Sequence, residues 1–121
     1  MKISNKEELG KFITISKEIP HDQIKIIYEN DYWDGPTEGV CLWNNEEYYF
    51  VWCGLMDEKD EIVRKFLLIR FTDDQFNMEK NEHLRFTELS KSGNLDKFYE
   101  EKESYPENTI DYSQVMGWFA D

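Results

Sequence analysis

The chain has 121 residues, of which 26 are acidic and 14 basic, and its formal net charge is −12. This length fits a single domain over 1–121, and a hydrophobic content of 40% supplies material for a core. Such a charge repels nucleic acid and anionic membranes and attracts basic proteins, although plain solubility explains it equally well. The chain has no apolar run of membrane-spanning length and no recognisable signal peptide, so we predict a cytoplasmic protein.

The first thirty residues predict short elements. Ser4 stands three residues before Glu7, which is the spacing of a capping box and predicts a short helix over 5–11. Residues 12–15 form a short strand in an alternative interpretation. The β-branched run 23–29 predicts a strand.

Residues 31–38 (DYWDGPTE) combine aromatic and acidic side chains around a Gly-Pro turn. Aromatic rings beside carboxylates suit a cation, a sugar or a basic protein partner. The alternative is that the rings fold into the core while the acids face water. We select Tyr32, Trp33, Asp34 and Glu38 as binding candidates.

A β-hairpin follows, with strands over 37–43 and 46–54. Asparagine tolerates the positive φ that a two-residue type I′ turn needs, so Asn44-Asn45 predicts that turn, and opposed residue numbers then sum to 89. Both faces of the hairpin are largely apolar, as in a sheet covered on both sides. Cys41 and Cys53 fall on different faces, so we predict two reduced thiols and no disulfide.

After a polar turn over 56–61, residues 62–71 predict a third strong strand. Three strands joined by short links form an antiparallel meander. The pattern then changes to a helical one: Thr72 to Gln75 has capping-box spacing and predicts a helix from Asp73 to about Thr87. The inward residues of this helix should be Phe76 and Leu84, with His83 as a further candidate.

Asn94 is a candidate cap for a second helix over 95–102. Pro106 ends the helical region, because the residue before proline avoids the α conformation. The tail, residues 109–121, is too apolar to remain undocked, so we expect it on the sheet as an edge strand or an ordered segment.

Glu79 and His83 lie four residues apart on one face of the first long helix, a spacing at which a metal site can begin. His21 is the other histidine, so the alternative is a salt-bridged or partly buried His83. Three arginines of the sheet-plus-helix half form an anion-binding cluster or, in the alternative interpretation, simply offset acids: Arg64, Arg70 and Arg85. We add Glu79, His83 and Arg85 to the binding candidates. Because no catalytic motif occurs, we predict no catalytic residue, no metal and no cofactor.

Two segments resemble a family of small uncharacterised bacterial proteins. Residues 31–50 are similar to its pattern of Asp-Gly-Pro-x-x-Gly, a strand, an Asn-containing turn and Tyr-Tyr-Phe, and residues 111–119 (DYSQVMGWF) resemble its closing Gly-Trp-Phe motif. The resemblance implies a bacterial, cytoplasmic source and a hairpin fold, and it carries over no catalytic residue. The family's helix after the third strand has counterparts here in Glu79, Glu82, His83 and Arg85.

These elements predict an α+β fold, an antiparallel β-meander of about four strands with two helices packed on it. The first functional hypothesis is a non-catalytic, immunity-like or inhibitor-like protein whose acidic surface masks a basic protein partner. The alternative is a small-ligand-binding or hydrolytic enzyme domain with a cleft between the 31–36 loop and the 79–85 helix face. A third hypothesis is an interaction module that is a homodimer rather than a monomer.

Overall fold

The computed structural model describes residues 1–11, 15–32, 36–58 and 61–120, and within these it describes only the backbone of 31–32, 36, 54–58 and 61–63. The predicted strand over 12–15 therefore lies largely outside the described residues. The chain divides into two compact units. Unit 1 comprises Met1–Ser4 and Phe71–Ile110, and unit 2 comprises Asn5–Arg70 and Asp111–Asp121.

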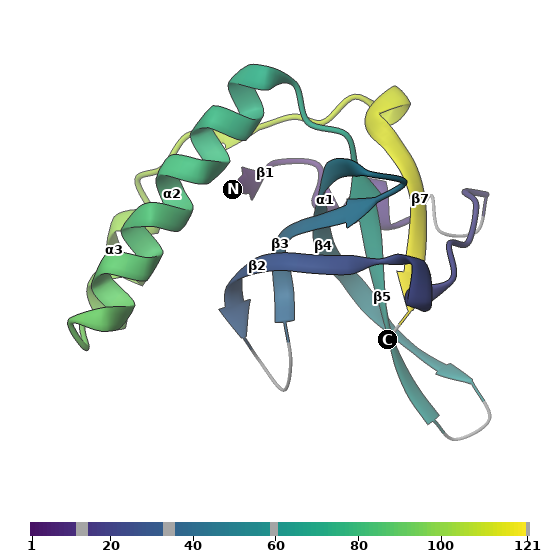
Figure 1. Cartoon of the computed structure of the whole chain (residues 1–121), viewed down its shortest axis with the longest axis horizontal. Coiled ribbons are helices and arrows are strands. Elements are labelled where there is room, and N and C mark those ends of the chain that lie inside the picture. The colour runs from purple at the N-terminus through teal and green to yellow at the C-terminus, as the bar shows by residue number, and fades with distance from the viewer. Residues whose placement is uncertain (12–14, 33–35, 59–60, 121) are drawn as a thin grey trace. The chain divides into compact units, whose positions relative to one another are not determined.

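Unit 2 is built around a five-stranded antiparallel sheet with the strand order β2-β3-β4-β5-β7 (Figure 1). Its strands are β2 (Lys25–Tyr32), β3 (Pro36–Trp43), β4 (Glu46–Glu58), β5 (Glu61–Ile69) and β7 (Val115–Ala120). Together with the helices, this sheet confirms the α+β class and the antiparallel meander. The tail supplies the fifth strand, β7, which pairs with β5 at one edge and confirms that the tail docks on the sheet.

The β3–β4 hairpin has the predicted turn and register. Asn44 and Asn45 have φ values of 50° and 62°, in the left-handed region that a type I′ turn requires. β3 pairs with β4 from Trp43 opposite Glu46 along the length of β3, and the numbers of each pair sum to 89. The short polar side chain of asparagine tolerates this conformation, so two local residues set the pairing of two whole strands.

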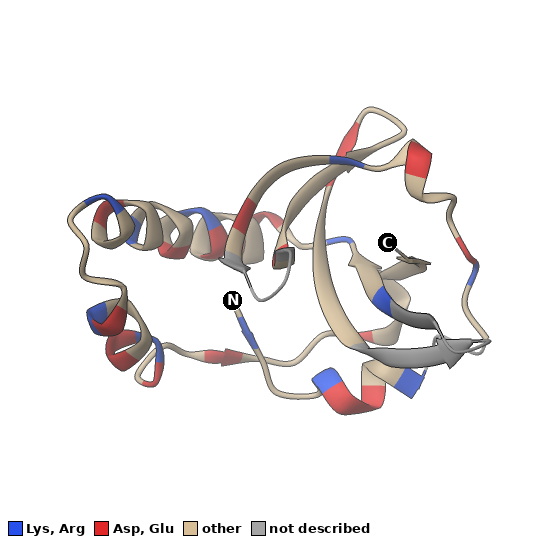
Figure 2. Cartoon of the chain, turned by 90° about the horizontal axis from the view of Figure 1, so that it is seen from below, with Lys and Arg blue, Asp and Glu red and all other residues tan. Residues whose placement is uncertain are grey.

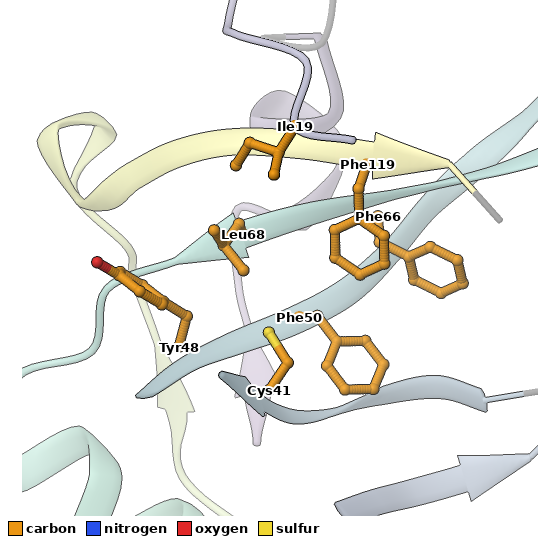
Figure 3. Packing of buried hydrophobic residues seen from close by; sticks show 7 residues of the cluster. All are labelled: Ile19, Cys41, Tyr48, Phe50, Phe66, Leu68 and Phe119. Atoms are coloured by element: carbon orange, nitrogen blue, oxygen red, sulfur yellow. The ribbon is translucent and has the colours of Figure 1, made fainter. Parts of the chain in front are cut away.

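One face of the sheet carries the main hydrophobic cluster of unit 2, whose side chains point toward one another (Figure 3). Phe66 stacks on Phe119 with ring centroids 5.2 Å apart, and Phe50 packs edge-on against Phe66 at 5.9 Å. Both geometries are favourable for aromatic pairs. The buried members of the cluster are Ile19, Cys41, Tyr48, Phe50, Phe66, Leu68 and Phe119.

The residues that alternate with this cluster are buried as well. They include Val40, Tyr49, Val51, Leu67 and Ile69. This burial confirms that the sheet is apolar on both faces. The two cysteines are free thiols, which confirms the absence of a disulfide between them.

The two edges of the sheet differ. At the β7 edge, the amide of Ile19 donates to the carbonyl of Trp118 at 2.7 Å, and the amide of Trp118 donates to the carbonyl of Lys17 at 2.9 Å. Gly117 permits this approach, because a Cβ there would lie 2.5 Å from the Lys17 oxygen. The edge strand β2 contains bulges, which interrupt a ladder and discourage edge-to-edge association.

Among its described residues, unit 2 also has the short helix α1 (Lys6–Gly10) and the 3-10 helices η2 (His21–Gln23) and η3 (Tyr112–Gln114). α1 falls within the predicted 5–11 helix, but the predicted Ser4 capping box is wrong. The N-cap residue is Asn5, and no side chain caps the helix. The Ser4 hydroxyl instead lies 2.8 Å from the hydroxyl of Thr109, within unit 1.

Unit 1 contains α2 (Asp73–Lys91), α3 (Leu95–Lys102) and two short parallel strands, β1 (Lys2–Ile3) and β6 (Glu107–Asn108). The capping box of α2 is confirmed: the Thr72 hydroxyl accepts from the Gln75 amide, and the Gln75 side chain accepts from the Thr72 amide. α2 continues past the predicted end at Thr87. It ends just before Gly93, whose φ of 75° favours glycine.

Within unit 1, α2 and α3 pack through aromatic side chains. Phe98 of α3 contacts Phe86 of α2 edge-on with centroids 5.2 Å apart. The buried residues of α2 are Glu79 and Leu89, whereas Leu84 is 66% exposed, so its prediction as an inward residue is wrong. Helical residues are about 100° apart, which places Leu84 about 200° from Phe86 around the axis. The prediction that two helices pack on the sheet concerns the position of unit 1 relative to unit 2. It therefore stays a prediction.

Candidate functional site

Four of the predicted binding residues come from the acidic aromatic segment of unit 2. Tyr32 is the last residue of β2, and Glu38 lies near the start of β3. Trp33, Asp34 and the side chain of Tyr32 lie outside the described residues. Glu38 accepts a hydrogen bond from the hydroxyl of Tyr49, whose side chain is fully buried, so the core of the sheet orients this carboxylate.

Glu38 belongs to an acidic strand pair at the end of the β2–β3 hairpin. The register sets Asp31 opposite Glu38 and Glu29 opposite Gly39. Residues 29–38 contain four acids and no base. This hairpin therefore concentrates acidic residues at its end.

The β4–β5 hairpin ends in a similar way. Glu58 lies opposite Glu61, and Asp57 lies opposite Ile62. Residues 57–61 contain four acids and one lysine. This hairpin therefore repeats, at its end, the opposition of two carboxylate-bearing residues.

Alternate turns of a meander lie at the same end of the sheet. The ends of the β2–β3 and β4–β5 hairpins therefore lie at one end of unit 2, along its lower side in Figure 1, and the Asn44-Asn45 turn lies at the other. We call the first the acidic end of the sheet, and define it by the backbone positions of Glu29, Asp31, Glu38, Asp57, Glu58 and Glu61. Unit 2 has 16 acidic and 8 basic residues, and half of these acids fall in the stretches 29–38 and 57–61.

Acidic and basic side chains are paired at the opposite end of the sheet. Arg70 donates to the carboxylate of Glu46 and to the hydroxyl of Tyr48, both at 3.0 Å, and Tyr48 donates to Glu46 at 2.8 Å. The hydrogen bond with Tyr48 and the nearby Glu46 carboxylate raise the pKa of Arg70 above its usual value. In Figure 2 the acidic and basic residues of the described part of the chain are coloured red and blue. At this end of the sheet, the carboxylate of Glu46 is therefore balanced by Arg70.

The acids at 57, 58 and 61 are not among the predicted binding residues, because the sequence of residues 56–61 indicates only a polar turn. The sequence nevertheless contains the information needed to group these acids with those of residues 29–38. A meander with short links must bring its first and third turns to the same end, and both of these turns are rich in Asp and Glu.

The remaining predicted binding residues lie on α2 in unit 1. Arg85 is held by two carboxylates: its Nε and Nη2 donate to Glu101 at 2.7 and 2.6 Å, and its Nη1 lies 3.3 Å from Glu88. The hydrogen bonds from Arg85 lower the pKa of Glu101. This bidentate pair joins α2 to α3, so Arg85 contributes to the fold of unit 1.

Glu79 and His83 also make contacts within unit 1. The side chain of Glu79 is 0% exposed, and its Oε1 lies 3.2 Å from the α-amino nitrogen of Met1. His83 is partly buried beside Thr87, and burial lowers its pKa while the Glu79 carboxylate opposes that shift. A cleft between these residues and the 31–36 loop would need both units and residues that are not described. It stays a prediction.

Across the described residues, no group of three or more His, Cys, Asp or Glu side chains is placed to hold a metal ion. The helices of this same part of the chain include none long and apolar enough to cross a membrane. Burial raises the pKa of Cys41 to about 12 and that of Cys53 to about 11, so neither is the low-pKa thiolate that a nucleophile needs.

Comparisons of the chain with protein-family models, with curated proteins and with solved structures find no match.

Proposed function

We propose that this protein is a non-catalytic binding protein of the immunity or inhibitor type, and that it masks a basic protein partner with the acidic end of its sheet. The observation behind this proposal is the arrangement of two hairpins in unit 2. Both end in opposed acidic positions at the same end of one sheet, and because Glu38 lies opposite Val51, the end of the β4–β5 hairpin extends about seven residues beyond that of the β2–β3 hairpin. Eight acids and one lysine occupy the two stretches.

A basic partner is the ligand class that such an end would attract. Two unit charges 4 Å apart near a protein surface interact by roughly 4 kcal/mol at an effective dielectric constant of about 20. Like charges at opposed positions of a sheet are unfavourable, and lysine or arginine side chains of a partner would offset the negative charge of these acids. The same field accelerates encounter with a positive surface.

The aromatic residues beside these acids are proposed as anchors. Tyr32 and Trp33 lie between Asp31 and Asp34 in the sequence. Tryptophan and tyrosine dominate the energetics of many protein interfaces, and both stack favourably with arginine and lysine. Acids would then supply attraction and orientation, while the rings would supply affinity.

An inhibitor of this kind needs no chemistry of its own, because it acts by covering a functional surface of its partner. A bacterial, cytoplasmic source is part of the proposal, since two free thiols fit a reducing compartment. The alternative of plain solubility predicts that the acids contribute through net charge alone, wherever they lie. The two interpretations therefore differ in whether binding depends on the positions of the acids or only on their number.

Two paired variants separate these interpretations. Asp57→Asn/Glu58→Gln removes two acids from the acidic end, and Asp22→Asn/Glu47→Gln removes two exposed acids near the opposite end. Both change the formal net charge from −12 to −10, because each pair replaces two carboxylates by amides. Immobilised wild-type protein is first used to retain proteins from the native lysate at low and at high salt. The retained basic protein is then titrated with all three chains.

The proposal predicts a partner that is released by high salt. It also predicts that the Asp57/Glu58 pair weakens binding by at least about tenfold, whereas the Asp22/Glu47 pair changes it by less than about threefold. Equal losses in the two variants would indicate a net-charge effect and would contradict a dedicated acidic end. The failure of any basic protein to bind at low salt would remove the proposed function.

A further inference from the structure

Residues 17–19 run parallel to β7 and cover part of this edge of the sheet, and we call them the strap. The amide of Ile19 donates to the carbonyl of Trp118 at 2.7 Å, and the amide of Trp118 donates to the carbonyl of Lys17 at 2.9 Å. Pro20 follows the strap, and because proline has no N–H, it donates no further bond to the edge. Both of these bonds between the strap and β7 are therefore made by the backbone of Trp118.

One side chain anchors the strap to the sheet. Ile19 is 1% exposed and belongs to the same hydrophobic cluster as Phe119 (Figure 3). The side chains of Lys17 and Glu18 are exposed. A Cβ on Gly117 would lie 2.9 Å from Cδ1 of Ile19, so the glycine leaves the space that the isoleucine fills. The attachment of the strap therefore depends on the fit of Ile19 over Gly117.

The sequence of β7 is typical of a strand that pairs with copies of itself. Its six residues, VMGWFA, include no charged residue and no proline. Short β-forming segments of low charge associate edge to edge unless something covers them. The other edge strand, β2, has different protection, because it contains bulges and the charged residues Lys25, Glu29 and Asp31. Of the two edges, β7 is therefore the one that depends on a cover.

We propose that β7 is a latent self-association edge, that the strap keeps it closed, and that its partner when open is β7 of a second copy of this chain. The N–H and C=O of Trp118 both point away from β5, since both bond to the strap. In an antiparallel pair, two opposed residues can exchange both of these bonds. Two β7 strands centred on Trp118 would therefore replace the strap bonds by bonds between the copies. Such a pairing has two-fold symmetry and closes at a dimer. It does not depend on the proposed binding of a basic partner.

Replacing Ile19 with serine tests the anchor, because Ile19→Ser shortens the buried side chain, makes it polar and leaves the formal net charge at −12. Ile27→Ser is the matched control, since Ile27 lies on the other edge strand, β2, and is 46% exposed. Sedimentation velocity over a concentration series measures dimer formation, and circular dichroism checks that each variant is folded. We expect Ile19→Ser to lower the apparent Kd of the dimer at least about tenfold relative to wild type, because this Kd falls as the open fraction rises. The control should leave it unchanged. Equal Kd values for the two variants, or open-ended aggregates in place of a dimer, would overturn the proposal.

Amide hydrogen exchange of the wild-type chain decides the question if Ile19→Ser does not fold. The amides of Ile19 and Trp118 bond across the strap, whereas Leu67 lies in β5, between β4 and β7. If the strap opens by itself, the protection factors of Ile19 and Trp118 should be at least about tenfold lower than that of Leu67. Equal protection of all three amides would mean that the strap leaves only when the sheet unfolds, and the latent edge would be refuted.

Discussion

Replacing Gly39 with alanine tests how closely β2 and β3 approach each other at the acidic end of the sheet. A Cβ at this position would lie 2.1 Å from the carbonyl oxygen of Tyr28, 2.8 Å from Cα of Glu29 and 3.0 Å from Cε1 of Phe50. The first two atoms belong to the backbone of β2, so no side-chain rotation relieves the clash. Gly39→Ala should therefore force the two strands apart.

The magnitude follows from these distances. Non-bonded carbon atoms attract each other best at roughly 3.5–4.0 Å, so the strands would have to separate by more than about 1 Å at this point. Overpacking of this kind costs about 1–3 kcal/mol. Each cross-strand hydrogen bond that is lost adds about 1 kcal/mol. We expect the free energy of unfolding to fall by about 3 kcal/mol, a large part of the roughly 5–15 kcal/mol of a typical domain.

Urea unfolding followed by tryptophan fluorescence measures this loss, since all four tryptophans belong to unit 2. Gly10→Ala is the matched control in the same unit. Its added Cβ would lie 3.3 Å from the carbonyl oxygen of Cys53, and a helical alanine gains about 1 kcal/mol over glycine, so the control should stay within about 1 kcal/mol of wild type. If Gly39→Ala proved as mild as Gly10→Ala, the close approach of β2 to β3 would be refuted.

Two further predictions concern titratable side chains. Because burial raises the pKa of Cys41 to about 12 and that of Cys53 to about 11, both should react with a disulfide reagent at about pH 8 much more slowly in the folded chain than in urea; equal rates would contradict their burial. Burial lowers the pKa of His83, so the unfolded chain binds more protons below the ordinary histidine value of about 6.5. The free energy of unfolding should therefore decrease as the pH falls through that range, and His83→Gln should remove this decrease; an unchanged pH profile in the variant would assign the decrease to another group.

The parts of the fold that were predictable from the sequence are those with local determinants. Asn44-Asn45 accepts the positive φ values of its turn, and that turn alone fixes the register of β3 and β4. The capping box from Thr72 to Gln75 likewise marks the start of α2 within four residues. In both cases the deciding interactions join residues that are close in the sequence.

Other features depend on residues that are distant in the sequence. The Ser4 hydroxyl bonds to Thr109, 105 positions away, so the capping-box spacing with Glu7 had no effect. The inward face of α2 includes Glu79, which pairs with the amino group of Met1. The spacing of apolar residues in the sequence cannot reveal such a charged pair. That spacing predicts Leu84 as an inward residue, although the Leu84 side chain is 66% exposed.

The candidate site was predictable in part for the same reason. Residues 31–38 stand out by composition, because two aromatic and three acidic residues occur there around a Gly-Pro sequence. The contribution of residues 57–61 emerges only when the order of the strands places the two turns at one end of the sheet. The charged residues are identifiable in the sequence, whereas their position at one end of the sheet depends on the order of the strands.

The dependence of affinity on salt, measured for the retained basic protein with the two paired variants, tests the central claim most directly. Exposed charges are screened beyond about 10 Å at 0.1 M salt, so an interface built on the acidic end should weaken steeply as salt rises. We predict a clearly smaller salt dependence for Asp57→Asn/Glu58→Gln than for wild type, and an unchanged one for Asp22→Asn/Glu47→Gln. Identical salt dependences in the two variants would contradict the proposal that the acidic end is the binding surface.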